Sequence, residues 1–221
     1  SGAVTFNVNH AIGNGTLSGI ISGGGSLTKA GAGWLTLSGN NTYTGATTIS
    51  NGTLKVGSAT ALGNASTVTV NNGASLDLNG QTMTSTGTLN LNGTGMSSTG
   101  ALTNSSTSAA TYAGALTLAS AATINGEAGT ITLSNASLSG NFTLTLDGSA
   151  GGTVSGVISS TATNGLVKQG GGTWSLAGTN TYSGTTALNA GVLKAASARA
   201  LGSNGAVTVS ANATLDLNGQ T

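Results

Sequence analysis

The acidic side chains are the first candidates for chemistry in this 221-residue chain, and they are Asp77, Glu127, Asp147 and Asp216. The separation of Glu127 and Asp147 in the sequence is close to one turn of a repetitive fold, so adjacent turns could bring them together. A carboxylate pair is what acid–base hydrolysis of a polysaccharide requires. Both residues stand alone among Gly, Ser and Asn, which favours turn positions. We therefore predict no catalytic residue and no enzymatic activity.

Two lysine–aspartate pairs are more regular. Lys55 and Asp77 have the same separation in the sequence as Lys194 and Asp216, again about one turn of a repetitive fold. In the first copy each charged residue lies between two apolar residues, so both should point outward from a strand. If the two strands are neighbours, the side chains face each other across about 4.8 Å. The spacing predicts two exposed structural charge pairs.

The remaining polar candidates favour no cofactor and no metal. Tyr43 and Tyr182 occupy matching sites, where each could stack on a sugar ring or cover a turn. His10 is the only histidine and is expected at the surface. The chain has no cysteine, which excludes thiolate ligands, and too few carboxylates for calcium. The glycine runs 23–25 and 170–172 lack the Lys-Ser/Thr that follows a phosphate loop.

The composition is unusual for a globular protein. The chain has 38 glycines, no proline and only 4% charged residues, where about a quarter is ordinary. A net charge of +1 gives no attraction to nucleic acid. No apolar run is long enough for a transmembrane helix, so we expect no membrane span in residues 1–221.

Short strands follow one another along the chain. Many read apolar–polar–apolar and are followed by Gly or Asn, which supply turns. No segment has a helical apolar stripe of useful length. The alternation predicts these inward residues: Leu35, Leu37, Leu54, Val56, Val68, Val70, Leu76, Leu78, Leu176 and Leu217.

A long internal repeat decides the architecture. Residues 15–82 match 152–221, and the match runs without a gap from Lys29, aligned with Lys168, to Thr82, aligned with Thr221, with 29 of 54 positions identical. Such a repeat needs a fold that grows by adding like units. The strands are also too short for a filled eight-stranded barrel. We predict an all-β, parallel β-solenoid of roughly ten coils, in which 1–221 is one continuous segment of a larger protein.

The repeat carries a family resemblance. The sequence GWLTLSGNNTYTG at 33–45, followed by TTI at 47–49 and GTLKV at 52–56, resembles the passenger-associated β-strand repeat of bacterial autotransporters. The second copy departs at Trp174, which aligns with Leu35 and so moves an aromatic side chain from an outward to an inward position. The resemblance implies a right-handed parallel β-helix that is secreted to the surface of a Gram-negative-type bacterium.

The most consistent function is therefore a structural and adhesive segment of an extracellular fibre. Its expected partners are other copies, through solenoid ends or faces, and host or matrix glycans. The alternative is a β-helix that binds or degrades extracellular polysaccharide. Ice binding is a third class, but pairs such as Thr130 and Thr132 do not recur at one coil position.

Overall fold

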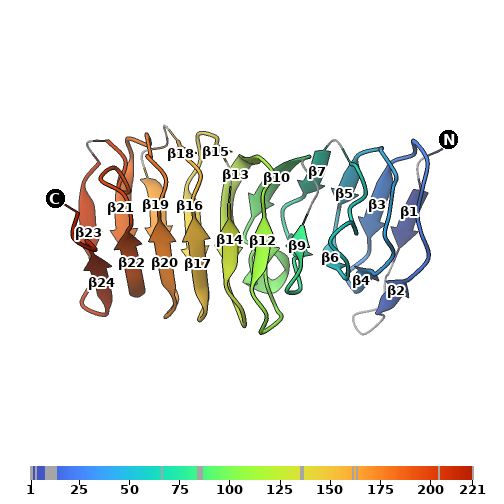
Figure 1. Cartoon of the computed structure of the whole chain (residues 1–221), viewed down its shortest axis with the longest axis horizontal. Coiled ribbons are helices and arrows are strands. Elements are labelled where there is room, and N and C mark those ends of the chain that lie inside the picture. The colour runs from blue at the N-terminus through green and yellow to red at the C-terminus, as the bar shows by residue number, and fades with distance from the viewer. Residues whose placement is uncertain are drawn as a thin grey trace.

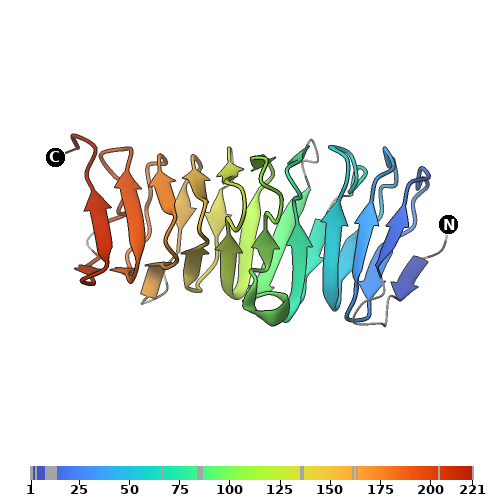
Figure 2. The same ribbon diagram turned by 90° about the horizontal axis from the view of Figure 1, so that it is seen from below.

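The chain forms a straight rod of stacked parallel strands, with its two ends at opposite ends of the rod (Figures 1 and 2). This computed structural model describes residues 2, 4–7, 14–65, 67–83, 87–134, 137–160, 162, 164–203 and 205–220. Within those ranges it contains strands and one short 3-10 turn, η1 (Met96–Ser98), and no α-helix. The predicted all-β solenoid is confirmed.

The strands stack in three columns along the rod. The first holds β1 (Val4–Asn7), β3 (Leu27–Ala30), β5 (Thr47–Ile49), β7 (Thr67–Val70), β10 (Thr88–Gly93), the first half of β13 (Leu116–Asn125), β15 (Leu138–Ser139) and β18 (Ile158–Ser159). The second holds β2 (Gly15–Leu17), β4 (Trp34–Leu37), β6 (Gly52–Val56), β8 (Ala74–Asp77), β11 (Leu102–Thr103), the second half of β13, β16 (Leu144–Asp147), β19 (Asn164–Lys168), β21 (Thr185–Leu188) and β23 (Val207–Val209). The third holds β9 (Thr82–Met83), β12 (Ala110–Tyr112), β14 (Ile131–Leu133), β17 (Gly151–Val154), β20 (Thr173–Leu176), β22 (Gly191–Ala195) and β24 (Ala213–Asp216).

The number of turns follows from the second column. Its ten strands are joined by nine parallel pairings, so the described chain makes about nine complete turns. The first two columns join through β13 into one 17-stranded sheet, and the third column is a separate 7-stranded sheet. Each strand is short because the chain must bend at every corner of the solenoid.

The core is a set of apolar rows inside these columns. Leu35, Leu54 and Leu76 stand above one another in register on β4, β6 and β8, and each is buried. Because equivalent side chains stack on one another, each inward side chain is shielded from water on both sides. Burying a Leu in this way stabilises the fold by about 1.5–3 kcal/mol. Nine of the ten predicted inward residues are buried.

The tenth residue, Leu217, is 50% exposed. Its repeat equivalent, Leu78, is fully buried within the stack. Leu217 follows β24, which pairs with β22 on one side and with no other described strand on the other. An inward residue is buried only when a further coil covers it.

The two repeat copies do not occupy the same columns. In the first copy β3, β4, β5 and β6 alternate between the first and second columns; their equivalents β19, β20, β21 and β22 alternate between the second and third. The first column advances six steps from β3 to β18, and β19 then lies in the second column. The period of the repeat is therefore six complete turns of the solenoid plus the step from one column to the next.

The two tryptophans differ as the sequence predicts. Trp34 is outward and 50% exposed, whereas Trp174 is fully buried and donates its Nε1–H to the Asp147 carbonyl at 2.8 Å. The register partner of Trp174 is Gly152. A side chain there would stand 2.8 Å from Trp174 Cζ3, so the absence of one makes room for the indole ring.

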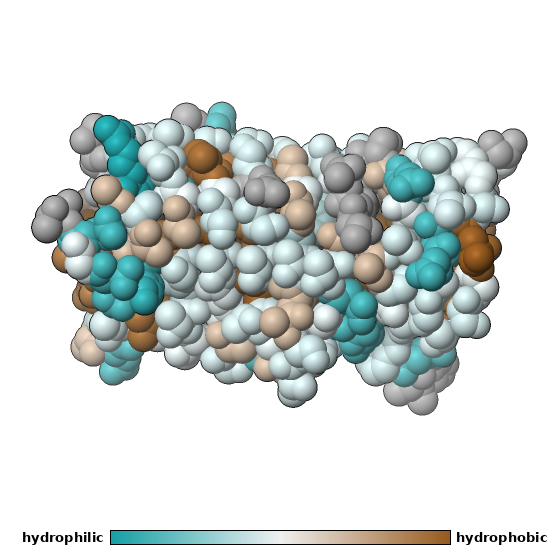
Figure 3. All heavy atoms as spheres, in the orientation of Figure 1, coloured by the Kyte–Doolittle hydropathy of each residue, from teal (hydrophilic) through white to brown (hydrophobic). Residues whose placement is uncertain are grey.

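The surface is weakly polar. On the face shown in Figure 3 most residues are neither strongly hydrophilic nor strongly hydrophobic, and strongly hydrophilic side chains occur in scattered groups. This matches a chain with only 4% charged residues. An isolated exposed aromatic or carboxylate therefore stands out as a candidate contact.

Candidate ligand-binding groove

The outward residues of the second column define one face of the rod. Register places Trp34 on β4 beside Thr53 on β6. In the next row Lys55 lies beside Asp77, and Asp77 lies beside Thr103 on β11. Alternation puts all five side chains on the outer side of their strands.

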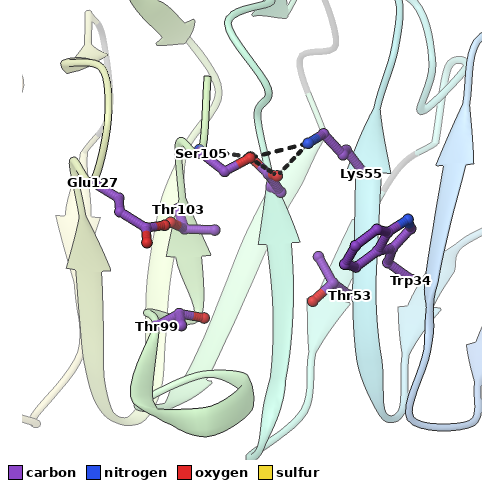
Figure 4. Close-up of a pocket in the computed structure, with 8 residues that line it drawn as sticks. Trp34, Thr53, Lys55, Thr99, Thr103, Ser105 and Glu127 are labelled. Carbon is purple, nitrogen blue, oxygen red and sulfur yellow. Dashed lines mark hydrogen bonds and ion pairs between the residues drawn. The ribbon is translucent and has the colours of Figure 1, made fainter. Parts of the chain in front are cut away.

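A hollow of about 270 Å³ opens on this face. Figure 4 shows Trp34 and Thr53 on one side and Thr103 and Glu127 on the other. The other lining residues are Lys55, Asp77, Thr99 and Ser105. We call this hollow the Trp34 groove.

The groove owes its walls to one enlarged turn of the solenoid. Leu76 and Leu102 are register partners, as Leu54 and Leu76 are, but the chain between the first pair is longer. The extra residues include η1, which is held by Met96 N–H donating to Ser75 Oγ at 2.9 Å. Figure 4 shows this turn below Thr99.

The second wall is the loop 104–109, which fixes the Lys55–Asp77 pair. Lys55 Nζ lies 3.4 Å from Asp77 Oδ2 and donates to Ser105 Oγ at 3.0 Å. Asp77 Oδ2 accepts from Ser105 Oγ at 2.6 Å, and Oδ1 accepts from the Asn79 and Ser105 N–H groups at 2.9 and 3.1 Å. The expectation that Asp77 is exposed is wrong, since the loop covers it to 4% exposure.

Two groups in the groove have unused bonding capacity. Thr103 is buried, and its Oγ1 has no hydrogen-bond partner among the described residues. Glu127 is exposed and reaches into the groove from the turn after β13. Its backbone carbonyl accepts from Ser149 Oγ, and its side chain lines the groove.

Within the described residues, the second copy lacks the exposed tryptophan and the ion pair of this groove. Lys194 and Asp216 are register partners on β22 and β24, in the third column. Among the described residues the ion pair within 4.0 Å is Lys55–Asp77. Thr173 stands where the first copy has Trp34.

Neither tyrosine offers a surface for sugars, which corrects that expectation. Tyr43 and Tyr182 are buried, and their hydroxyls bond to Thr47 Oγ1 at 2.7 Å and Thr186 Oγ1 at 2.8 Å. Burial raises the pKa of both hydroxyls, and the threonine bond partly opposes it. The tyrosines fill a corner of the solenoid that has no strand.

Sequence reasoning missed two buried lysines. Lys29 Nζ donates to the carbonyls of Ala30, Gly31 and Asn51 at 3.0, 2.8 and 3.1 Å. Lys168 repeats this with Gln169, Gly170 and Ala190 at 2.7, 2.7 and 3.0 Å. The signal was available, because Lys29 alternates in phase with inward Leu27.

Burial also governs the charge of these lysines. It lowers the pKa of Lys29 from 10.5 to about 8. Burial lowers the pKa of Lys168 as well, while the nearby Asp147 carboxylate raises it in part. Both ammonium groups act as structural cross-links between adjacent turns.

Two buried asparagines make a second set of repeated cross-links. Asn41 accepts from Ile21 N–H at 2.8 Å and donates to the Ala61 carbonyl at 2.6 Å. Asn180 makes the same bonds to Ile158 and Ala200, at 2.8 and 2.6 Å. Each asparagine ties together three successive turns.

The other candidate chemistry finds no support. Asp147 binds the Gly148 N–H at 2.7 Å and Gln169 Nε2 at 2.8 Å, and its register partner is Asn125. Within the described ranges no cluster of three or more metal-binding side chains occurs. His10 lies outside the described residues.

Comparisons with known proteins agree with the repeat. The passenger-associated-transport repeat matches residues 27–56 and 166–195, which hold both buried lysines, asparagines and tyrosines. The chain is 36% identical over 181 residues, 81% of its length, to the Adhesin BmaC autotransporter of Brucella suis biovar 1 (strain 1330), and covers 4% of that protein. No solved structure matches. In the described part of the chain, no helix is long and apolar enough to span a membrane. The chain is therefore a β-solenoid built on two passenger-associated-transport repeats, as its resemblance to autotransporter passengers predicted.

Proposed function

We propose that this segment is a non-catalytic, adhesive part of a passenger displayed outside a Gram-negative bacterium. The observation that carries the proposal is the similarity to an autotransporter adhesin over 81% of the chain. A rod of about nine turns, cross-linked between turns by buried lysines and asparagines, is suited to holding contacts away from a cell. Its weakly charged surface favours contacts through hydroxyl and amide groups over ionic attraction.

Adhesion is tested directly with the purified 221-residue segment. Beads coated with the folded segment are expected to adhere to cultured epithelial cells or extracellular matrix more than beads coated with the heat-unfolded segment. Equal retention of the two kinds of bead would contradict adhesion. Antibodies against the segment should also label intact cells of the source bacterium without permeabilisation.

The alternative is cleavage of an extracellular polysaccharide. It would need a second free carboxylate near Glu127, and Asp77 is already engaged by Lys55, Asn79 and Ser105. A reducing-sugar assay on plant, bacterial and matrix polysaccharides decides between the two functions. Turnover that disappears in Glu127→Gln would overturn the non-catalytic proposal.

A further inference from the structure

The exposed indole of Trp34 is the first sign of a ligand. It is half exposed and borders the groove, whose other lining residues are all polar or charged. A flat indole face packs well against the C–H face of a pyranose ring, while its N–H can donate to a hydroxyl. An aromatic platform beside a few placed polar groups is a common design for a small-molecule site.

Thr103 provides a second and independent sign. Its Oγ1 lies buried in the groove lining, where no group of the described residues bonds to it. Buried polar groups in folded proteins nearly always have a partner, so an unpaired one requires an explanation. A hydroxyl of a bound ligand would provide the missing partner once the side chains that cover Oγ1 move aside.

The charge of the groove favours a neutral ligand. Lys55 and Asp77 neutralise each other in the ion pair, and Glu127 adds one further negative charge. This net charge repels carboxylated or sulfated sugars. The Glu127 carboxylate can accept hydrogen bonds from sugar hydroxyls.

The length of the groove favours a chain of sugars over a single ring. Trp34 lies on β4 and Glu127 follows β13, four strand steps along the second column. At about 4.8 Å a step, the backbone positions that carry the two side chains are separated by about 19 Å along the rod. One pyranose ring cannot contact both.

From these features we propose that the Trp34 groove binds a neutral oligosaccharide. Trp34 is the stacking platform, and Thr103 and Glu127 bond to hydroxyls farther along the chain. The Lys55–Asp77–Ser105 network holds one edge of the groove rigid. The inference rests on the proposed adhesive function and gives it a ligand class.

The test uses the whole 221-residue segment and measures the accessibility of Trp34 to acrylamide. Trp174 is fully buried, so quenching reports mainly on Trp34. The probes are the hexasaccharides of cellulose, starch and chitin, with a hyaluronan hexasaccharide as the acidic comparison. At least one neutral probe is expected to protect Trp34, and calorimetry should give the same affinity.

Variants assign the binding to the groove. Trp34→Thr copies the second repeat at Thr173 and is expected to weaken neutral-sugar binding at least tenfold. Thr103→Val removes only the unpaired hydroxyl and should weaken binding several-fold without lowering thermal stability. Phe142→Ala removes another exposed aromatic and should leave binding unchanged.

Three outcomes would overturn the inference: no binding to any neutral glycan on an array, undiminished binding by Trp34→Thr, or preference for the acidic probe.

The bead assay distinguishes a failure of this inference from a failure of the proposed adhesive function. If Trp34→Thr beads adhere as well as unaltered beads, the groove is not the adhesive site and adhesion stands. If the groove binds sugar but unaltered beads do not adhere, the site stands and the adhesive function fails.

Discussion

At the scale of single residues, the buried lysines are the least expected feature. Each ammonium group replaces water at three turn carbonyls, and two of those carbonyls belong to the turn that follows the lysine itself. The third lies one turn farther along the solenoid. One side chain thus closes its own turn and fastens it to the next.

Replacing Lys29 with Met keeps the aliphatic stem but removes all three donors. The substitution is expected to lower the free energy of unfolding by about 1–3 kcal/mol, because three carbonyls in part-buried hydrogen bonds lose their charged partner. Urea unfolding followed by circular dichroism measures it. Lys194→Met, at a half-buried lysine, is the control and should change stability by less than about 0.5 kcal/mol. Equal midpoints for the two variants would contradict the cross-link.

The pKa of Lys29 gives a pH dependence with a definite sign. Burial lowers this pKa from 10.5 to about 8, so between those values the unfolded chain binds a proton that the folded chain has released. The free energy of unfolding should therefore rise with pH through this window and be flat below it. The measurement should stop near pH 10, where the buried tyrosines, whose pKa values are raised, begin to act in the opposite direction. The pH slope should be smaller in Lys29→Met, and an unchanged slope would exclude Lys29 as its source.

Single residues also show what the sequence could and could not predict. Strand alternation correctly placed Leu35, Leu54 and Leu76 inside and Trp34 outside. It could not show that the loop 104–109 folds over Asp77, because that contact joins residues 28 positions apart through a loop with no periodic pattern. The unpaired Thr103 hydroxyl is equally invisible in sequence.

At the scale of strands, the inward Trp174 depends on its neighbour. Gly152→Ala would place a methyl group 2.8 Å from Trp174 Cζ3 and closer still to the Ile131 carbonyl oxygen. We expect a loss of about 1–3 kcal/mol from this overpacking, measured as a lower unfolding midpoint. Gly171→Ala is the matched control, since nothing lies within 4 Å of its added carbon. Equal stability of the two variants would contradict this, because it would mean that β17 and β20 accommodate the added methyl group without loss of stability.

The Lys55–Asp77 pair joins β6 and β8 across one strand step. Its coupling in a double-mutant cycle should be about 0.2–1 kcal/mol and should decrease with added salt, because the lysine side chain is 30% exposed. Asp77→Ala should lower the free energy of unfolding more than Lys55→Ala. It also leaves the Ser105 and Asn79 donors without their acceptor. A double-mutant cycle with no coupling at low salt would show that the ion pair does not contribute to stability.

The sequence predicts strands better than it predicts columns. Most strands carry an alternating pattern, so their existence could be read directly. The column that a strand joins depends on turn length, and the step from Leu76 to Leu102 is longer than the step from Leu54 to Leu76. Without the structure, nothing shows that β4 and β20, equivalent in sequence, belong to different columns.

At the scale of the whole rod, the last coil of the isolated segment exposes apolar side chains. Val207, Val209 and Leu217 are exposed there, and among the described strands β23 and β24 each have one neighbour. Unpaired edges of this kind promote pairing with another chain. We expect the isolated segment to associate reversibly at high concentration in sedimentation experiments. Val209→Lys combined with Leu217→Lys should keep it monomeric, whereas Phe142→Lys should not. A monomer at every concentration would contradict this.

The extra column in the repeat has a consequence for geometry. Had the period been a whole number of turns, the rows Lys55–Asp77 and Lys194–Asp216 would point the same way and could meet one flat surface together. They instead lie on different sides of the rod. In three successive repeats of this period, the Lys–Asp rows would face three different directions. The row of a fourth repeat would face the same direction as the first. Such a rod would contact partners all around its circumference, as a cross-linker within a matrix does, and would not lie against a single plane.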